Sequence, residues 1–306
     1  MFIQALICVA TMLLYAIPGY LMVKTKLTPG EHISTLAKLL LYVSQPCLTV
    51  HSIRKCGFTW QSFGRMGISF GLMLLLTVVS LLLLFLIVRR PSKESIQLRI
   101  FNIAGCIGNY GFIGVPLLNA MMPDHPEVIA YTAMASLAMN ILMWTACSAI
   151  ITRNMRYISL RKIFLNPVSL ATLVALPLWM CGVTLPAQLD SMIALLAEMS
   201  TPLCMLILGM RLATMPLRDI FLRPALYGAV AIKQLLFPLF TFALLLLLPL
   251  DPVLEIAIYL LTCCPVASGV LNISELLGQG QDKAAGTVLL GTSLSVLTIP
   301  LMTLLL

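Results

Sequence analysis

The feature that most constrains this chain is a series of apolar runs, each long enough to cross a lipid bilayer as a helix. A spanning helix needs about 20 mostly apolar residues. Only 10% of the 306 residues are charged, whereas a soluble domain carries roughly 25%. The sequence therefore predicts an all-α, multi-pass membrane protein in a lipid bilayer, without a separate soluble domain. We expect ten transmembrane helices, at residues 3–23, 33–53, 66–88, 98–121, 129–152, 167–184, 191–212, 225–249, 254–277 and 284–305.

The distribution of basic residues predicts how these helices are oriented, because cytoplasmic loops are enriched in Lys and Arg. With the N-terminus outside, only Arg54, Lys55 and Arg65 fall in outside connections, and Lys233 lies within a span. We therefore expect both termini outside, in a bacterial inner membrane. The basic clusters set topology and do not indicate a nucleic-acid partner. The other fifteen basic residues fall on the cytoplasmic side: Lys24, Lys26, Lys38, Arg89, Arg90, Lys93, Arg99, Arg153, Arg156, Arg161, Lys162, Arg211, Arg218, Arg223 and Lys283.

The two halves of the chain, residues 1–152 and 153–306, show a weak repeat at an offset of 156 residues. Ser44-Gln45-Pro46 matches Ser200-Thr201-Pro202, and Ser136 matches Thr292. Five helices per half is an odd number, so the second half enters the membrane in the opposite orientation. This pattern predicts two inverted five-helix repeats, an architecture of many secondary transporters. The alternative is chance similarity among Leu-rich helices.

The fourth and ninth predicted helices are interrupted at corresponding depths. The segment from Gly105 to Pro116 contains four glycines and a proline, and the other runs from Pro265 to Asn272. Broken helices are tolerated in a membrane only where protein or a watery cavity satisfies their backbone, and a matched pair points to a transporter binding site. Half-helix N-termini favour an anion. Asn109 and Asn272 can hydrogen-bond such an anion or coordinate a cation, and Ser268 can do either. The alternative is that the glycines only allow close helix packing.

Ionisable residues inside the predicted spans are few, and such residues usually have a function. Glu198 precedes Ser200-Thr201-Pro202 and is a candidate to carry a coupling proton, unless it lies at the outer interface. Lys233 is a candidate to attract an anion or to replace a bound cation, unless it snorkels to the surface. The sequence has no phosphate-binding loop, no metal-ligand spacing and no protease motif. We therefore predict neither an enzyme nor a resident cofactor or metal.

Four segments resemble the auxin efflux carrier family of bacteria and plants, within the bile/arsenite/riboflavin transporter-like superfamily. They are GNYGFIGVPL at 108–117, LGMRLA at 208–213, KQLLFP at 233–238, and Pro265–Asn272 with a last helix ending in TIPL at 298–301. The resemblance implies a scaffold of helices 1, 2, 6 and 7. Helices 3–5 and 8–10 would form a transport domain, with helices 4 and 9 crossing near Pro116 and Pro265.

The resemblance also implies a substrate class and a set of site residues. Family members carry small organic anions such as malate, malonate or auxin, and a homodimer is one expected assembly. The third helix lacks the carboxylate of some members, so coupling to H⁺ or Na⁺ stays open. Candidate coupling or charge residues are Lys233, Glu198 and Asn140. The candidate substrate-binding residues are Asn109, Tyr110, Gly111, Pro116, Asn119, Pro265, Ser268, Asn272, Gln45 and Thr201.

The sequence favours a carrier of mono- or dicarboxylates that works by alternating access. The alternative is a cation/proton antiporter or a channel-like protein with the same broken-helix architecture. Such an exchanger usually has one or two acidic groups at the crossing, where this chain has Asn109 and Asn272. A membrane enzyme or receptor has only the polytopic character in its favour.

Overall fold

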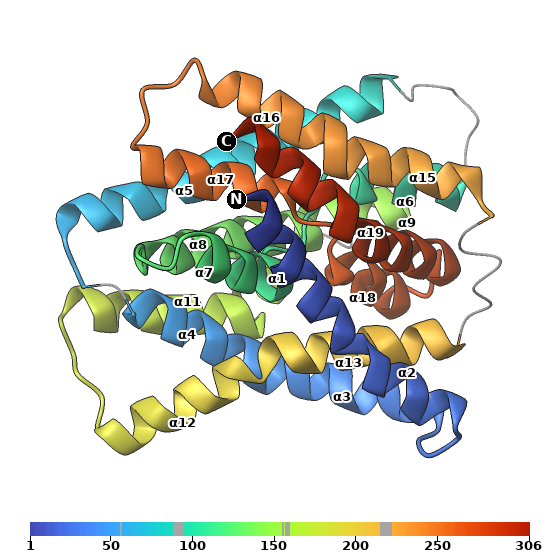
Figure 1. Cartoon of the computed structure of the whole chain (residues 1–306), viewed down its shortest axis with the longest axis horizontal. Coiled ribbons are helices and arrows are strands. Elements are labelled where there is room, and N and C mark those ends of the chain that lie inside the picture. Colours follow the sequence, from blue (N-terminus) through green and yellow to red (C-terminus); the bar gives the residue numbers. More distant parts are fainter. Residues whose placement is uncertain (56, 88–94, 155, 157–159, 215–221) are drawn as a thin grey trace.

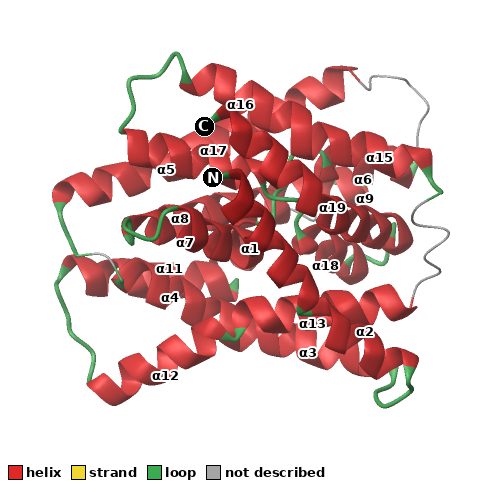
Figure 2. Cartoon of the chain, in the orientation of Figure 1, coloured by secondary structure: helices red, strands yellow, loops and turns green. Residues whose placement is uncertain are grey.

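The regular structure of the chain is helical throughout the part that the computed structural model describes, which is residues 1–55, 57–87, 95–154, 156, 160–214 and 222–306 (Figure 2). Arg89, Arg90, Lys93 and Arg218, used above to predict orientation, lie outside these residues. The prediction of an all-α multi-pass membrane protein is confirmed. Seven helices in the described residues are long and apolar enough to cross a membrane, and shorter apolar helices cover Tyr110–Met121, Pro167–Met180 and Pro252–Cys263. The seven are Phe2–Lys24, Gly30–Arg54, Trp60–Leu86, Glu127–Thr152, Ala187–Thr214, Pro224–Leu245 and Gln281–Leu305.

Most of these long helices consist of shorter α-helical pieces joined by bends or wide turns. In the first half the pieces are α1 (Phe2–Leu14), α2 (Ala16–Lys24), α3 (Ile33–Leu39), α4 (Gln45–Arg54), α5 (Trp60–Ile87), α6 (Ile96–Ala104), α7 (Val115–Met121), α8 (Glu127–Leu142) and α9 (Ser148–Thr152). In the second half they are α10 (Leu160–Phe164), α11 (Pro167–Met180), α12 (Ala187–Glu198), α13 (Ser200–Thr214), α15 (Pro224–Ala231), α16 (Phe237–Leu245), α17 (Pro252–Cys263), α18 (Ser268–Leu276) and α19 (Gln281–Met302).

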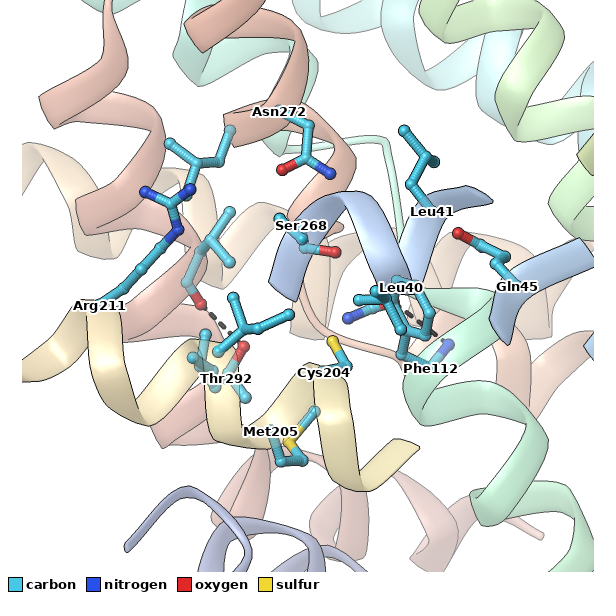
Figure 3. A pocket seen from close by; sticks show the side chains of 16 residues that line it. Leu40, Leu41, Gln45, Phe112, Cys204, Met205, Arg211, Ser268, Asn272 and Thr292 are labelled. Atoms are coloured by element: carbon cyan, nitrogen blue, oxygen red, sulfur yellow. Dashed lines mark hydrogen bonds between the residues drawn. The ribbon is translucent and has the colours of Figure 1, made fainter. Parts of the chain in front are cut away.

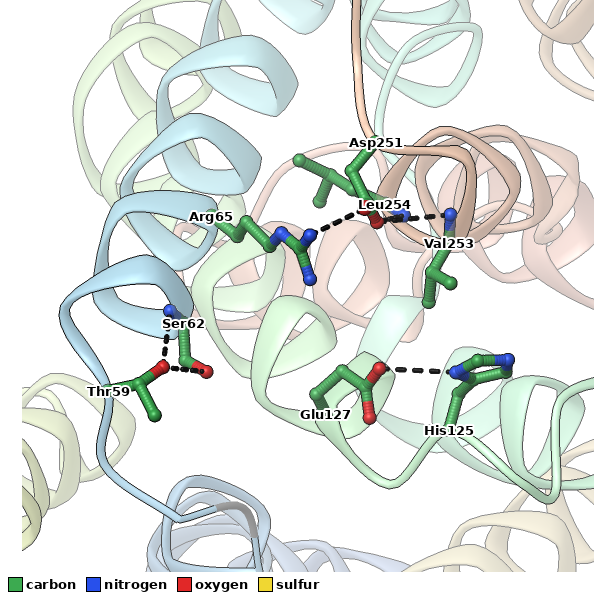
Figure 4. Close-up of polar contacts among 8 residues, drawn as sticks. All are labelled: Thr59, Ser62, Arg65, His125, Glu127, Asp251, Val253 and Leu254. Carbon is green, nitrogen blue, oxygen red and sulfur yellow. Dashed lines mark hydrogen bonds and ion pairs between the residues drawn. The ribbon is translucent and has the colours of Figure 1, made fainter.

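The third predicted helix begins at Trp60, earlier than the expected residue 66. The hydroxyl of Thr59 accepts a hydrogen bond from the Ser62 backbone N–H at 3.0 Å (Figure 4). A threonine in this position satisfies one of the free amides at a helix start. The helix therefore extends through the polar residues before Met66, which hydropathy alone assigns to the loop.

Three wide π-helical turns precede prolines inside long helices. They cover Leu40–Ser44, Tyr110–Gly114 and Ile232–Leu236, and each ends two residues before a proline, at Pro46, Pro116 and Pro238. Proline lacks the N–H that an α-helix needs and clashes with the carbonyl four residues back. A wider turn relieves that clash locally. These prolines thus bend the helices without breaking them.

The helices are arranged in layers (Figure 1). Helices α2, α3, α4, α11, α12 and α13 lie along one edge, α5, α15, α16 and α17 lie along the other, and α7, α8, α18 and α19 lie between them. Within the first layer α2 packs on α13, and α4 packs on both α11 and α12. The first helix contacts the last turn of the chain, Thr303–Leu305, so the two ends of the chain lie close together (Figure 1).

The contact between α2 and α13 is a backbone contact made possible by two glycines. A Cβ atom on Gly209 would lie 1.8 Å from the carbonyl oxygen of Ala16, and one on Gly19 would lie 2.1 Å from that of Leu206. No side chain fits at either position. Small residues commonly allow such close approach where membrane helices cross.

Candidate substrate cavity

The two predicted helix breaks are paired with each other in the middle of the molecule. The first break lies between α6 and the wide turn that starts at Tyr110, and the second lies between α17 and α18. Gly108 and Val266 form an antiparallel bridge. The N–H of Asn109 donates to the carbonyl of Pro265 at 2.8 Å, and the N–H of Ala267 donates to the carbonyl of Ile107 at 3.1 Å. Each break thus satisfies backbone groups that lipid would leave unpaired.

The predicted position of the first half of the crossing, near Pro116, is wrong. The chain crosses at Gly108, while Pro116 lies within the first turn of α7 and directs its carbonyl toward the thiol of Cys8. Glycine is needed at this crossing, because a Cβ on Gly108 would lie 2.3 Å from the Tyr110 ring. The predicted position at Pro265 is correct, since its carbonyl belongs to the bridge.

A cavity of about 40 Å³ opens beside the crossing, between α13 and α18. This volume exceeds the ~10–15 Å³ that a cavity needs to hold one water molecule. Its polar lining residues come from four helical segments and from the first break. In Figure 3, Ser268 and Asn272 lie between Arg211 on one side and Gln45 on the other. The polar lining consists of Gln45, Asn109, Arg211, Ser268, Asn272 and Thr292.

The charges around this cavity favour an anion. Arg211 is the charged member of the lining in the described part of the chain, and no carboxylate is among the lining residues described. The N-terminal residue of α18, Ser268, faces the cavity, and no side chain caps that helix end. The amide of Gln45 is nine-tenths buried and has no hydrogen-bond partner among the described residues. The free backbone N–H groups at the start of α18 attract negative charge, and the Gln45 side-chain amide can donate to the same anion.

Lys233 lies on another side of the crossing and does not line the cavity. It is fully buried, so the alternative that it snorkels to the surface is wrong. Its ammonium donates to the carbonyl of Thr262 at 2.7 Å and lies 4.6 Å from the centre of the Phe237 ring. Thr262 is in the last turn of α17, where a cation complements the negative end of the helix dipole. The cation therefore supports the end of one half-helix.

The other predicted site residues lie near the crossing or away from it. Tyr110 is buried, and Gly111 lies so close to Gln45 that a Cβ there would be 3.2 Å from the Gln45 amide nitrogen. Thr201 donates to the carbonyl of Phe112 at 3.3 Å. These three residues lie close to the crossing, but none of them is among the residues that line the cavity.

Three further candidates lie apart from the cavity. Asn119 and Glu198 are exposed on the surface of the protein. Asn140 donates to the carbonyl of Ser136, four residues back in α8, at 3.1 Å. None of the three is among the residues that line the cavity.

Arg211 and Thr292 were missed as site residues. Arg211 was interpreted as a topology signal, although it stands in the LGMRLA segment that carries the family resemblance. Thr292 stands at the repeat position of Ser136, and its hydroxyl is already bonded to the Val288 carbonyl at 2.8 Å. The matched repeat position was the available signal for Thr292.

A bundle of apolar helices with paired breaks beside a polar cavity is typical of a membrane transporter, and the family to which the chain belongs shows that it is a transporter and not an enzyme. The model of the membrane transport protein family matches the chain twice, over residues 4–154 and 148–303. The chain belongs to this family, which is the auxin efflux carrier family of the resemblance. A similar protein is the "Putative malonate transporter" of Rhizobium meliloti (strain 1021), 26% identical over 300 residues that cover 92% of this chain and 89% of that protein.

Proposed function

We propose that this protein is a secondary transporter that moves small organic anions, mono- or dicarboxylates, by alternating access around the crossed breaks. The observation that carries the proposal is the cavity itself. It combines amide and hydroxyl donors, one guanidinium and an uncapped helix start, and its described lining has no carboxylate. The relative named for malonate supports the same substrate class.

In the proposed architecture, ten helices form two inverted five-helix repeats, residues 1–152 and 153–306. Helices 1, 2, 6 and 7 act as a scaffold, and helices 3–5 and 8–10 move against it. The double match of the family model supports the repeat, and the close α2–α13 contact supports a rigid scaffold. A cavity of about 40 Å³ must widen to admit an organic anion, and such widening requires relative motion of its walls. The homodimer stays a prediction.

A cation/proton antiporter is the alternative class. Such an exchanger usually has one or two acidic groups at the crossing, whereas the described cavity lining has no carboxylate and one guanidinium. Lys233 beside the crossing also repels a cation. Coupling of anion movement to H⁺ or Na⁺ is compatible with this arrangement and forms part of the proposal's test.

The test is uptake into proteoliposomes from a panel of labelled carboxylates, with and without a sodium or proton gradient. Asn272→Leu removes a cavity donor, and Asn109→Ser removes the amide NH₂ donor while its shorter hydroxyl supplies an oxygen that can accept from the Phe112 N–H in place of the amide oxygen. Each change should raise the substrate concentration at half-maximal uptake by roughly ten- to hundredfold, because a hydrogen bond to a charged group is worth about 1.5–3 kcal/mol. The double variant should depart from additivity.

The matched control is Gln188→Leu, an exposed amide on α12 away from the cavity. It should transport like the unchanged protein. Unchanged half-saturation in both asparagine variants would show that the breaks serve packing, and the site would then be sought near Gln45, Thr201 and Glu198. Failure of every carboxylate to enter would reject the substrate class.

A further inference from the structure

Arg211 combines a place in the cavity with an ion pair to a residue outside it. Its guanidinium contacts Glu275 at two points, Nη1 to Oε1 at 2.6 Å and Nη2 to Oε2 at 3.0 Å. Glu275 is exposed and does not line the cavity. The other ion pairs described, Arg54–Asp190, Arg65–Asp251 and His125–Glu127, involve no cavity residue. Among the ion pairs described, Arg211 is therefore the residue that connects a pair to the cavity.

The two helices that carry this pair present matched stripes of side chains to each other. On α13, Cys204, Leu208 and Arg211 are spaced by four and three residues, which places them on one face. On α18, Ser268, Asn272 and Glu275 have the same spacing. The first two members of each stripe and Arg211 line the cavity, and Figure 3 shows Cys204, Ser268, Asn272 and Arg211 among them. The cavity thus ends where the guanidinium meets the carboxylate of Glu275.

The two-point contact shows what Arg211 is shaped to bind. A planar guanidinium pairs with a carboxylate through two parallel hydrogen bonds, and Glu275 supplies that group in this structure. The carboxylate of a substrate is the same chemical group. Asn272 and Glu275 are separated by about 4.5 Å of helix rise, so a short dicarboxylate bound near Asn272 brings its second carboxylate within reach of Arg211.

We propose that Arg211 selects dicarboxylates by binding the second carboxylate of the substrate, and that Glu275 occupies this place on Arg211 while the cavity is empty. This inference rests on the proposed function, that the cavity takes an organic anion. A monocarboxylate engages only the donors around Ser268 and Asn272. A dicarboxylate engages these donors and also exchanges with Glu275, which opens the end of the cavity.

The test compares the binding of malonate and monomethyl malonate, which share a skeleton but differ by one carboxylate, to the purified full-length protein. Arg211→Gln should raise the Kd for malonate by roughly ten- to hundredfold and leave that for the monoester unchanged. Glu275→Gln removes the competing carboxylate and should lower the Kd for malonate by roughly two- to fivefold, the scale of an exposed ion pair. Arg54→Gln, which breaks the Arg54–Asp190 pair away from the cavity, is the matched control and should change neither value.

A charge swap separates ligand recognition from a purely structural role of the pair. Arg211→Glu combined with Glu275→Arg restores an ion pair between α13 and α18 but removes the guanidinium from the cavity. Thermal stability should recover while malonate binding stays weak; recovery of both would overturn the inference. Equal weakening of the two ligands by Arg211→Gln would also overturn it. If the unchanged protein binds both ligands and Arg211→Gln leaves the Kd for malonate unchanged, only this inference fails. If the unchanged protein binds neither ligand, the proposed function is rejected as well.

Discussion

Lys233 shows how one buried charge supports a broken helix. Its ammonium bonds the Thr262 carbonyl at the end of α17 and has no access to solvent. Lys233→Met should insert and purify, but it leaves a buried acceptor unpaired, which costs about 1–3 kcal/mol. We expect a lower unfolding temperature in detergent and a lower transport rate in proteoliposomes. Lys24→Met, at an exposed helix end, is the control. If Lys233→Met transports as fast as the unchanged protein, Lys233 has only a packing role.

At the scale of residues, the sequence predicts the side chains that stand at the helix breaks. Asn109, Ser268 and Asn272 follow from glycine and proline patterns, because the physics of an interrupted helix in lipid requires polar groups there. Arg211 does not follow, since an arginine at a cytoplasmic helix end has the same pattern whether it faces water or a cavity. The burial of Lys233 was likewise open, because a snorkelling lysine also stands inside an apolar run.

At the scale of elements, the helix contact between α2 and α13 depends on Gly209. A new Cβ there would lie 1.8 Å from a backbone oxygen, which cannot rotate away as a side chain does. Gly209→Ala should therefore destabilise the protein by at least the ~1–3 kcal/mol typical of overpacking. The measurement is thermal unfolding in detergent. Gly67→Ala on α5, where a Cβ meets nothing within 4 Å, should leave stability unchanged or raise it; equal behaviour of the two variants would contradict the packing argument.

The long apolar helices could be predicted, and their internal geometry could not. Long apolar runs between basic clusters locate the helices because the bilayer fixes their length. The wide turns before Pro46, Pro116 and Pro238 could not be predicted, since proline is also compatible with a kink or a break. Sequence periodicity does not distinguish these outcomes. The pairing of Gly108 with Val266 also lies beyond local pattern, because it depends on how two distant segments meet.

At the scale of the whole molecule, the remaining prediction concerns orientation in the membrane. The bias of fifteen basic residues against three places both termini outside by the positive-inside rule. The contact of the first helix with the end of the chain requires both ends to lie on one side, as an even number of crossings provides. A reporter fused after Leu306 should therefore be active in the periplasm of a Gram-negative host.

Two exposed glycine turns provide matched internal controls for this topology. Gly182 follows α11 and Gly278 follows α18, each with a positive φ that suits a tight turn, and a Cβ at either position meets nothing within 4 Å. In spheroplasts of that host, an epitope inserted at Gly182 should be accessible, and one at Gly278 should become accessible only after the inner membrane is permeabilised. Because five helices per half invert the second repeat, a cytoplasmic C-terminus would require an odd number of crossings or the opposite orientation. Labelling of Gly182 and Gly278 from the same side would exclude the inverted repeat. If their sides were exchanged, the inverted repeat would stand but the orientation in the membrane would be the opposite one.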